Sequence, residues 1–212
     1  IAAPIGQGMR RMDVLTLLTF VWPEAQAVFP RDPRKLLVVG AADPMWRGGL
    51  SAPNSLFMHA ERPLVSENGT SSVVHELVHV LSGIRDTDAS DWISEGLAEY
   101  YAIELLRRAG GMTEPRYQQV RKKLLHWGLK VTSLRGEHSN GAITARSVVL
   151  LQELDKEIRQ VSEGRYSLDD VARGLMRMDK VSTKDLIELS ESLLGKPSKV
   201  LNSKLLRKPK AA

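Results

Sequence analysis

Apolar residues in the first segment of the chain recur at helical spacing. Within residues 9–29 they fall three or four positions apart, at Val14, Leu17, Leu18 and Val21, which predicts a helix. Pro23 lies inside this segment and lacks the backbone N–H that an inner helical turn uses. We therefore expect Pro23 to kink or interrupt the helix.

Two short apolar runs follow, and each predicts a buried strand. The first covers residues 35–40 and the second covers residues 56–60. Gly48 and Gly49 lie between the two runs and predict a turn, because paired glycines favour turns. A polar loop at residues 67–70 closes this part of the chain.

From residue 71 onward the pattern is helical. Ser71 or Ser72 is suited to cap a helix that runs to Ser82, with Gly83 as its stop. The spacing of apolar residues predicts further helices at residues 92–108, 115–127 and 143–161.

Two Ser-x-x-Asp sequences predict the starts of two shorter helices. They begin at Ser167 and Ser182 and have the form of capping boxes with aspartate in the usual glutamate position. Gly195 is suited to end the second of these helices. Together the elements predict an α+β fold that is predominantly helical. Residues 1–70 are expected to form a small mixed N-terminal lobe, and residues 71–212 a larger helical lobe of the same catalytic unit.

Composition excludes several classes of protein. The 212 residues suffice to bury a sizeable core. The absence of cysteine excludes disulfides, a thiolate zinc site and a cysteine nucleophile. No apolar run is long enough for a transmembrane helix, which needs about 18 residues or more.

The net charge is +5, but the basic residues are spread along the chain, so we expect no nucleic-acid partner. The densest basic cluster lies in the tail, at Lys204, Arg207, Lys208 and Lys210.

Residues 75–79 have the sequence His-Glu-Leu-Val-His, an HExxH motif. On a helix, His75 and His79 lie one turn apart on the same face, so both imidazoles can bind one zinc ion. Glu76 is adjacent to the first histidine and can act as general base on a water molecule. The neighbouring residues are apolar, and burying two histidines and a glutamate without partners would be costly. A single zinc ion per chain removes that cost.

A catalytic zinc site needs a third protein ligand and an open position. The next predicted helix offers Glu95 and Glu99, which lie one turn apart on one face. One of them can bind the metal while the other hydrogen-bonds a ligand histidine. Gly96 follows Glu95 and would allow the two helices to approach closely.

The sequence HELVH followed by WISEGLAEYY resembles the gluzincin metallopeptidases, which include thermolysin, the alanyl-type aminopeptidases and the glycyl aminopeptidase family. This resemblance implies that Glu95 is the third zinc ligand and that Glu99 hydrogen-bonds a ligand histidine. It also implies a thermolysin-like catalytic domain. The 15 residues between His79 and Glu95 form a shorter connection than is usual in thermolysin and the alanyl type.

The resemblance extends to a substrate-binding segment. Residues 48–55 are similar to the substrate-binding edge strand of the glycyl aminopeptidase family, which implies that substrate is contacted by Gly49, Ser51, Asn54 and Ser55. We expect a peptide to lie extended along residues 54–59 and to add itself to the sheet edge. The aminopeptidases have a glutamate on this strand that binds the free amino terminus, and the matching residue here is Ser51. This difference favours an endopeptidase over an aminopeptidase.

The family also uses a tyrosine to hydrogen-bond the oxyanion, and this chain has no tyrosine between Tyr117 and Tyr166. If the chain is aligned with the family at Gly141, the position of the tyrosine falls on His138. If it is aligned at residues 154–155, the position falls on Thr144. A histidine can donate a hydrogen bond to an oxyanion, so we take His138 as the candidate catalytic residue, with Thr144 as the alternative.

These observations predict a zinc-dependent peptidase that hydrolyses peptide bonds in peptides or proteins by a metal-activated water. A second hypothesis is an inactive peptidase-like module that binds extended peptides. A third is a helical protein without metal whose basic tail docks on anionic membranes. The resemblance implies a location in the bacterial periplasm or cell envelope. Because the sequence starts at Ile1, we expect it to be a trimmed or mature form.

Overall fold

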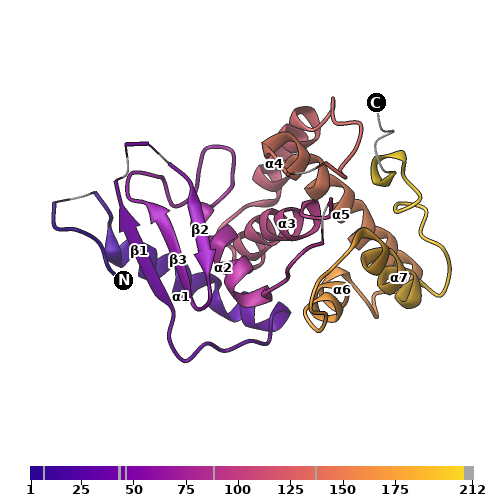
Figure 1. Cartoon of the computed structure of the whole chain (residues 1–212), viewed down its shortest axis with the longest axis horizontal. Helices are drawn as coiled ribbons and strands as arrows, with labels where there is room; N and C mark the ends of the chain where they lie inside the picture. Colours follow the sequence, from indigo (N-terminus) through magenta and orange to yellow (C-terminus); the bar gives the residue numbers. More distant parts are fainter. Residues whose placement is uncertain (7, 43, 46, 88, 137, 208–212) are drawn as a thin grey trace. The chain divides into compact units, whose positions relative to one another are not determined.

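The computed structural model describes residues 1–6, 8–42, 44–45, 47–87, 89–136 and 138–207. Its contacts define two compact units. The first unit consists of Ile1–Gly83 and Tyr101–Gln118, and the second consists of Ile84–Tyr100 and Gln119–Ala212. In chain order (Figure 1), the elements are α1 (Arg11–Val28), β1 (Leu37–Ala41), β2 (Gly49–Ala52), β3 (Ser55–His59), α2 (Ser72–Ser82), α3 (Trp92–Arg108), α4 (Glu114–Trp127), α5 (Gly141–Val161), α6 (Leu168–Leu175), α7 (Thr183–Leu194) and the 3-10 turn η1 (Lys204–Leu206).

The first unit contains a three-stranded sheet in the order β1-β3-β2 (Figure 1). β1 pairs with β3 in parallel, and β2 pairs with β3 in antiparallel orientation. A two-residue turn joins β2 to β3, and its second residue, Asn54, takes a φ of 53°, which asparagine tolerates better than most residues. α2 packs against β2 and β3, and α1 packs against α2.

Two predictions for this unit are corrected by the structure. Gly49 opens strand β2, so the predicted turn at Gly48 and Gly49 is wrong at its second residue. Antiparallel pairing with β3 holds this short segment extended despite its glycine. Pro23 lies inside α1 without ending it, so the predicted interruption is wrong, whereas the predicted kink stays a prediction. The buried face of α1 explains this continuity, because packing of Val14, Leu18, Val21, Ala25 and Val28 outweighs one missing backbone hydrogen bond.

The second unit is helical, and α5 packs against both α6 and α7. Both predicted capping boxes are confirmed. In the second box, the Ser182 hydroxyl accepts a hydrogen bond from the Asp185 backbone N–H, and Asp185 accepts one from the Ser182 N–H at 2.8 Å. The same reciprocal arrangement joins Ser167 to Asp170. Gly195 ends α7 with a φ of 67°, in the left-handed region that favours glycine.

The capping boxes make stability depend on pH. Hydrogen bonds from the Ser182 hydroxyl and N–H lower the pKa of Asp185 below its ordinary value of 3.8. A carboxyl group whose pKa is lower in the folded protein stabilises it above the unfolded value, and this stabilisation is lost as the pH falls through the folded value. We therefore expect Asp185→Asn to lower the Tm at pH 6 by more than it does near pH 3, in calorimetric scans at both pH values.

The exposed Asp32 provides the control for this experiment, because Asp32→Asn changes the same side chain outside any helix cap. Its effect on Tm should be small at both pH values. An Asp185→Asn effect of equal size at pH 6 and pH 3 would contradict the assigned role of the charged carboxylate.

The fold is predominantly helical α+β, as the sequence predicts. The two compact units group residues by contact. The predicted lobes are defined differently: residues 1–70 are expected to carry the substrate-side strand, and residues 71–212 the zinc site, of one catalytic unit. That division stays a prediction.

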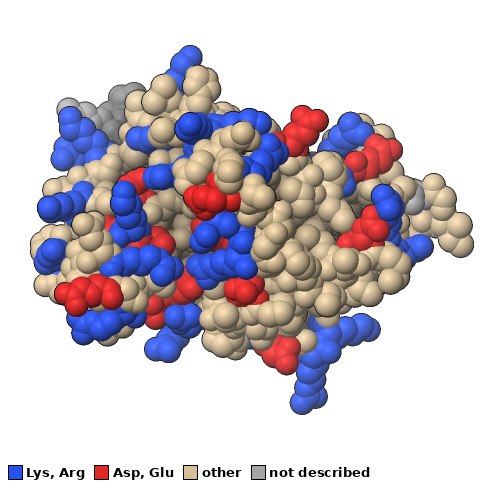
Figure 2. All heavy atoms as spheres, turned by 180° about the vertical axis from the view of Figure 1, so that it is seen from behind, with Lys and Arg blue, Asp and Glu red and all other residues tan. Residues whose placement is uncertain are grey.

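Charged side chains are mixed on the face of the molecule shown in Figure 2. Lys and Arg side chains lie among Asp and Glu side chains there, in agreement with the spread of basic residues along the sequence. Of the predicted basic tail cluster, Lys208 and Lys210 lie outside the described residues. Among the helices of the described ranges, none is both long and apolar enough to cross a membrane.

Candidate metal centre

Helix α2 presents two histidines on one face because of its local sequence. The Ser71 hydroxyl caps its start by accepting a hydrogen bond from the Val74 N–H. Gly83 ends it with a left-handed φ of 59° and donates its N–H to the His79 carbonyl at 3.0 Å. The opposite face of α2 is buried, so the histidines keep a fixed orientation relative to the sheet of the first unit.

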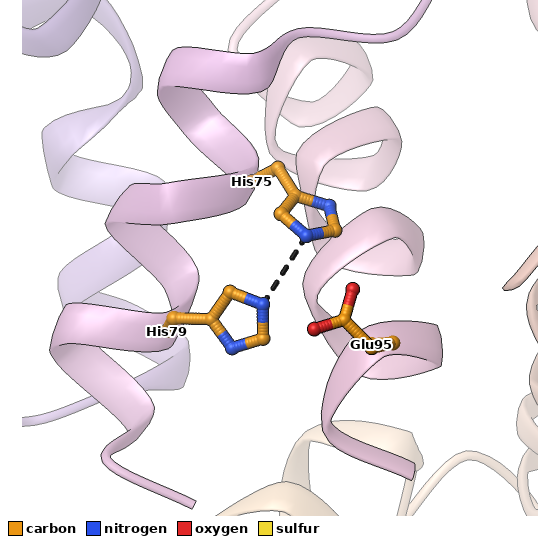
Figure 3. Close-up of side chains that lie close together, drawn as sticks. All are labelled: His75, His79 and Glu95. Atoms are coloured by element: carbon orange, nitrogen blue, oxygen red, sulfur yellow. Dashed lines mark hydrogen bonds between the residues drawn. The ribbon is translucent and has the colours of Figure 1, made fainter. Parts of the chain in front are cut away.

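The structure brings His75, His79 and Glu95 together. One ligand atom from each residue can be chosen so that all three lie within 4.8 Å of one another, and each residue is half-buried. The Nε2 atoms of the two histidines are 3.2 Å apart. Figure 3 shows both imidazoles, from α2, and the Glu95 carboxylate, from α3, pointing toward one another.

This donor set fits a zinc ion. Zn–N distances of about 2.0–2.1 Å in tetrahedral geometry separate two ligand nitrogens by about 3.3 Å, close to the 3.2 Å between the two Nε2 atoms. Two imidazoles and one carboxylate also match the ligand chemistry of catalytic zinc sites that use a histidine pair and a glutamate.

The start of α3, where Glu95 lies, is anchored by a buried polar network in the second unit. The indole N–H of Trp92 donates to the Thr183 hydroxyl at 3.1 Å. The Thr183 N–H donates to the Ser90 hydroxyl, also at 3.1 Å. All three side chains are at most 3% exposed. Because Trp92 and Glu95 are one helical turn apart, this network fixes the turn of α3 from which the Glu95 side chain extends.

Two further contacts hold the same turn of α3. Asp91 accepts hydrogen bonds from the backbone N–H and the hydroxyl of Ser139, at 2.6 and 3.2 Å. Gly96 lies against α5, where a Cβ would lie 2.7 Å from the Cβ of Ser147. The prediction that Gly96 allows α2 and α3 to approach closely is therefore wrong in its partner, because Gly96 lies against α5.

We expect Thr183→Val to destabilise the protein by about 1–3 kcal/mol, because valine keeps the shape of threonine but leaves the buried Trp92 N–H without its acceptor. Urea unfolding followed by circular dichroism measures this loss. Thr132→Val, at an exposed position, is the matched control and should change stability little. Equal stabilities of the Thr183→Val variant and the wild type would contradict the anchoring role.

The remaining predicted catalytic residues differ in their burial and in the elements that carry them. Glu76 is buried on α2, with 8% of its surface exposed. Glu99 is half-buried on α3, one turn after Glu95, and the metal-ligand group found among the described residues contains Glu95 and not Glu99. His138 is exposed in the loop before α5, next to the Ser139 that Asp91 holds, and Thr144 is half-buried in the first turn of α5. The catalytic role of His138, the alternative Thr144 and the role of Glu99 stay predictions.

The residues predicted to contact substrate divide between two strands and a turn. Gly49 and Ser51 lie on β2, Asn54 lies in the turn, and Ser55 begins β3. β3 pairs with a strand on each side, so the expectation that a peptide adds to the sheet along residues 54–59 is wrong. β2 lies at one edge of the sheet, as the resemblance of residues 48–55 implies for residues 49–52. The contacts of these residues with substrate stay predictions.

Sequence reasoning missed the residues that anchor α3. Ser182 was readable as a helix cap, but no local signal indicates that the next residue, Thr183, accepts the indole N–H of Trp92, which lies 91 positions earlier. The bond between Asp91 and Ser139 likewise joins residues 48 positions apart. These partners are identifiable only from the folded chain.

Comparison with known proteins supports the fold. The chain is similar to the crystal structure of an aminopeptidase N family protein from Idiomarina loihiensis, with a TM-score of 0.64 and 14% sequence identity. The match covers 92% of this chain and 40% of that protein, so the chain spans well under half the length of its structural neighbour. No protein-family model and no curated protein sequence matches the chain. At this identity the likeness shows the fold alone, and the chain has a peptidase-like fold.

Proposed function

We propose that the chain is a zinc-dependent peptidase of the gluzincin type. The observation that carries this proposal is the convergence of His75, His79 and Glu95, whose ligand atoms lie within 4.8 Å of one another. The HExxH motif on a buried, capped helix and the peptidase-like fold support it further.

In this proposal the two histidines and Glu95 hold one zinc ion, and Glu99 hydrogen-bonds a ligand histidine. A bound zinc ion supplies Lewis acidity, which lowers the pKa of a nearby water to about 7 and polarises a peptide carbonyl. The anchoring network around Thr183 keeps Glu95 oriented for this role, since ligand carboxylates depend on the groups that hold them.

Glu76 is the proposed general base. Its carboxylate takes a proton from the attacking water and then passes it to the nitrogen of the leaving amine. Helical geometry keeps it beside His75 without making it a ligand. His138 is the proposed donor of a hydrogen bond to the oxyanion, and its neighbour Ser139 is tied to Asp91 at the start of α3.

The proposed substrate is an extended peptide or protein segment that pairs with β2. Three of the four residues of β2 are exposed, and β2 lies at an edge of the sheet, where a peptide can add as a further strand. Ser51 occupies the position at which aminopeptidases bind the amino terminus through a glutamate, so we propose endopeptidase rather than aminopeptidase activity. The term aminopeptidase belongs to the structural neighbour, of which this chain covers 40%.

A second candidate function is a peptidase-like module that binds extended peptides without cutting them. The features that favour it are Ser51 in place of the glutamate and the lack of a tyrosine between Tyr117 and Tyr166. Under this alternative the metal group and β2 would still bind zinc and peptide.

Two measurements on the purified chain test the proposal. Elemental mass spectrometry without added zinc or chelator should give about one zinc per chain, and a panel of unstructured proteins should be cleaved internally, with fragments identified by peptide mass spectrometry. Retention of these substrates without cleavage would favour the binding module. If the purified chain neither contains zinc nor takes it up, both candidate functions are excluded.

A further inference from the structure

The side chain of Glu76 lies directly against the backbone of Gly49. A Cβ added to Gly49 would lie 2.6 Å from Oε1 of Glu76, 2.8 Å from its Cγ and 3.1 Å from its Cδ. All three distances are shorter than nearly all observed contacts of real Cβ atoms. The carboxylate of Glu76 therefore occupies the space that any other residue at position 49 would fill.

The backbone of Gly49 does not itself require glycine. Gly49 is absent from the residues with positive φ, and it lies in regular antiparallel register opposite Met58. An alanine would fit this strand conformation. Glycine is needed at this position because of its neighbour on α2.

Glu76 has little freedom to move away from Gly49. Its exposed fraction is 8%, and the residues that follow it, Leu77 and Val78, are fully buried. α2 packs against both β2 and β3, so the helix backbone cannot shift without disturbing the sheet. An added methyl group at position 49 would therefore have to displace the carboxylate itself.

We propose that Gly49 is a positioning residue for the general base, in that its missing side chain forms the space that holds the Glu76 carboxylate against edge strand β2. This inference rests on the proposed function, in which Glu76 moves the proton and β2 pairs with the substrate. It gives the glycine a role that differs from substrate contact, because it acts through Glu76. The arrangement puts the base beside the strand on which the scissile peptide would lie, as proton transfer from an attacking water requires.

Turnover measurements on Gly49→Ala in the full chain test the catalytic part of the proposal. We expect kcat on a cleaved unstructured protein, β-casein, to fall by about 10- to 100-fold, because small displacements of a catalytic group are costly. KM should stay within a few-fold of the wild-type value, because the backbone groups that pair with a peptide remain in place. Zinc content should be unchanged, since the three ligands are untouched. Unchanged kcat in the variant would overturn the proposal.

Gly40→Ala is the matched control for steric strain in the same sheet. Gly40 lies on β1, where a Cβ would meet the side chain of Met9 and not Glu76. This variant should lower the Tm while leaving kcat near the wild-type value. A fall in kcat as large as that of Gly49→Ala would show a general effect of strain and would overturn the positioning role.

A double-mutant cycle on stability tests the contact without any substrate or metal. In the metal-free protein, Gly49→Ala should lower the Tm by roughly 2–4 °C when Glu76 is present and by much less in a Glu76→Ala background, where the space is free. Equal losses in the two backgrounds would overturn the proposal. The zinc content and turnover of the wild type test the proposed peptidase function, whereas the double-mutant cycle tests the contact between Gly49 and Glu76. A failure of the peptidase function is therefore distinguishable from a failure of the positioning role.

Discussion

Replacing Glu76 with glutamine is expected to lower kcat by about 10²- to 10⁴-fold, the range that general acid–base catalysis supplies. Glutamine has nearly the shape of glutamate and fits the same space beside Gly49, but its amide cannot take a proton from water. His75, His79 and Glu95 are unchanged, so zinc content should stay at the wild-type level. Initial rates on an unstructured protein, with metal analysis of the same samples, measure both quantities.

The exposed Glu188, which pairs with Lys184 on α7, provides the control for this experiment. Glu188→Gln makes the same chemical change far from α2 in sequence and should leave kcat unaltered. If the Glu76→Gln variant binds zinc and turns over substrate at nearly the wild-type rate, Glu76 is not the general base.

Replacing Glu95 with alanine is expected to weaken zinc binding by more than about 100-fold, because removal of a ligand costs more than the 10- to 100-fold typical of the residues that orient ligands. The variant should be purified with little zinc. Added zinc should raise the Tm of the wild type and leave that of the variant nearly unchanged, since only a ligand that binds the folded state stabilises it. Competition with a chromogenic chelator measures the affinity.

Glu99→Ala is the most informative comparison, because Glu95 and Glu99 lie one turn apart on the same helix and are both half-buried. If Glu99 orients a histidine, its removal should weaken zinc binding by about 10- to 100-fold, less than the removal of Glu95. A larger loss from Glu99→Ala would reverse the two roles, and equal zinc affinity of the wild type and Glu95→Ala would exclude Glu95 as a ligand.

The local features of the site could be predicted from the sequence because they depend on neighbouring residues. The capped helix from Ser72 to Ser82, with its two histidines one turn apart, follows from residues 71–83 alone. The capping boxes at Ser167 and Ser182 are similarly local, since a hydroxyl and a carboxylate three residues apart satisfy each other's backbone groups.

The order of the strands could not be predicted from the same kind of pattern. Residues 49–52 contain one glycine and little apolar periodicity, so their extended conformation depends on hydrogen bonds to β3. The parallel pairing of β1 with β3 leaves β2 at the edge and puts β3 at the centre. Strand pairing joins distant segments, and its free energy is not contained in any one of them.

The sequence by itself determined the helices, their caps, the HExxH face of α2 and the predominantly helical α+β class, because hydrophobic periodicity and capping act over a few residues. Only the tertiary structure decided that Trp92 is anchored by Thr183 and that Gly49 makes room for Glu76. Both pairs join residues at least 27 positions apart in the sequence. Such pairs form because burial and packing of the whole chain favour one arrangement, and no local propensity specifies their partners.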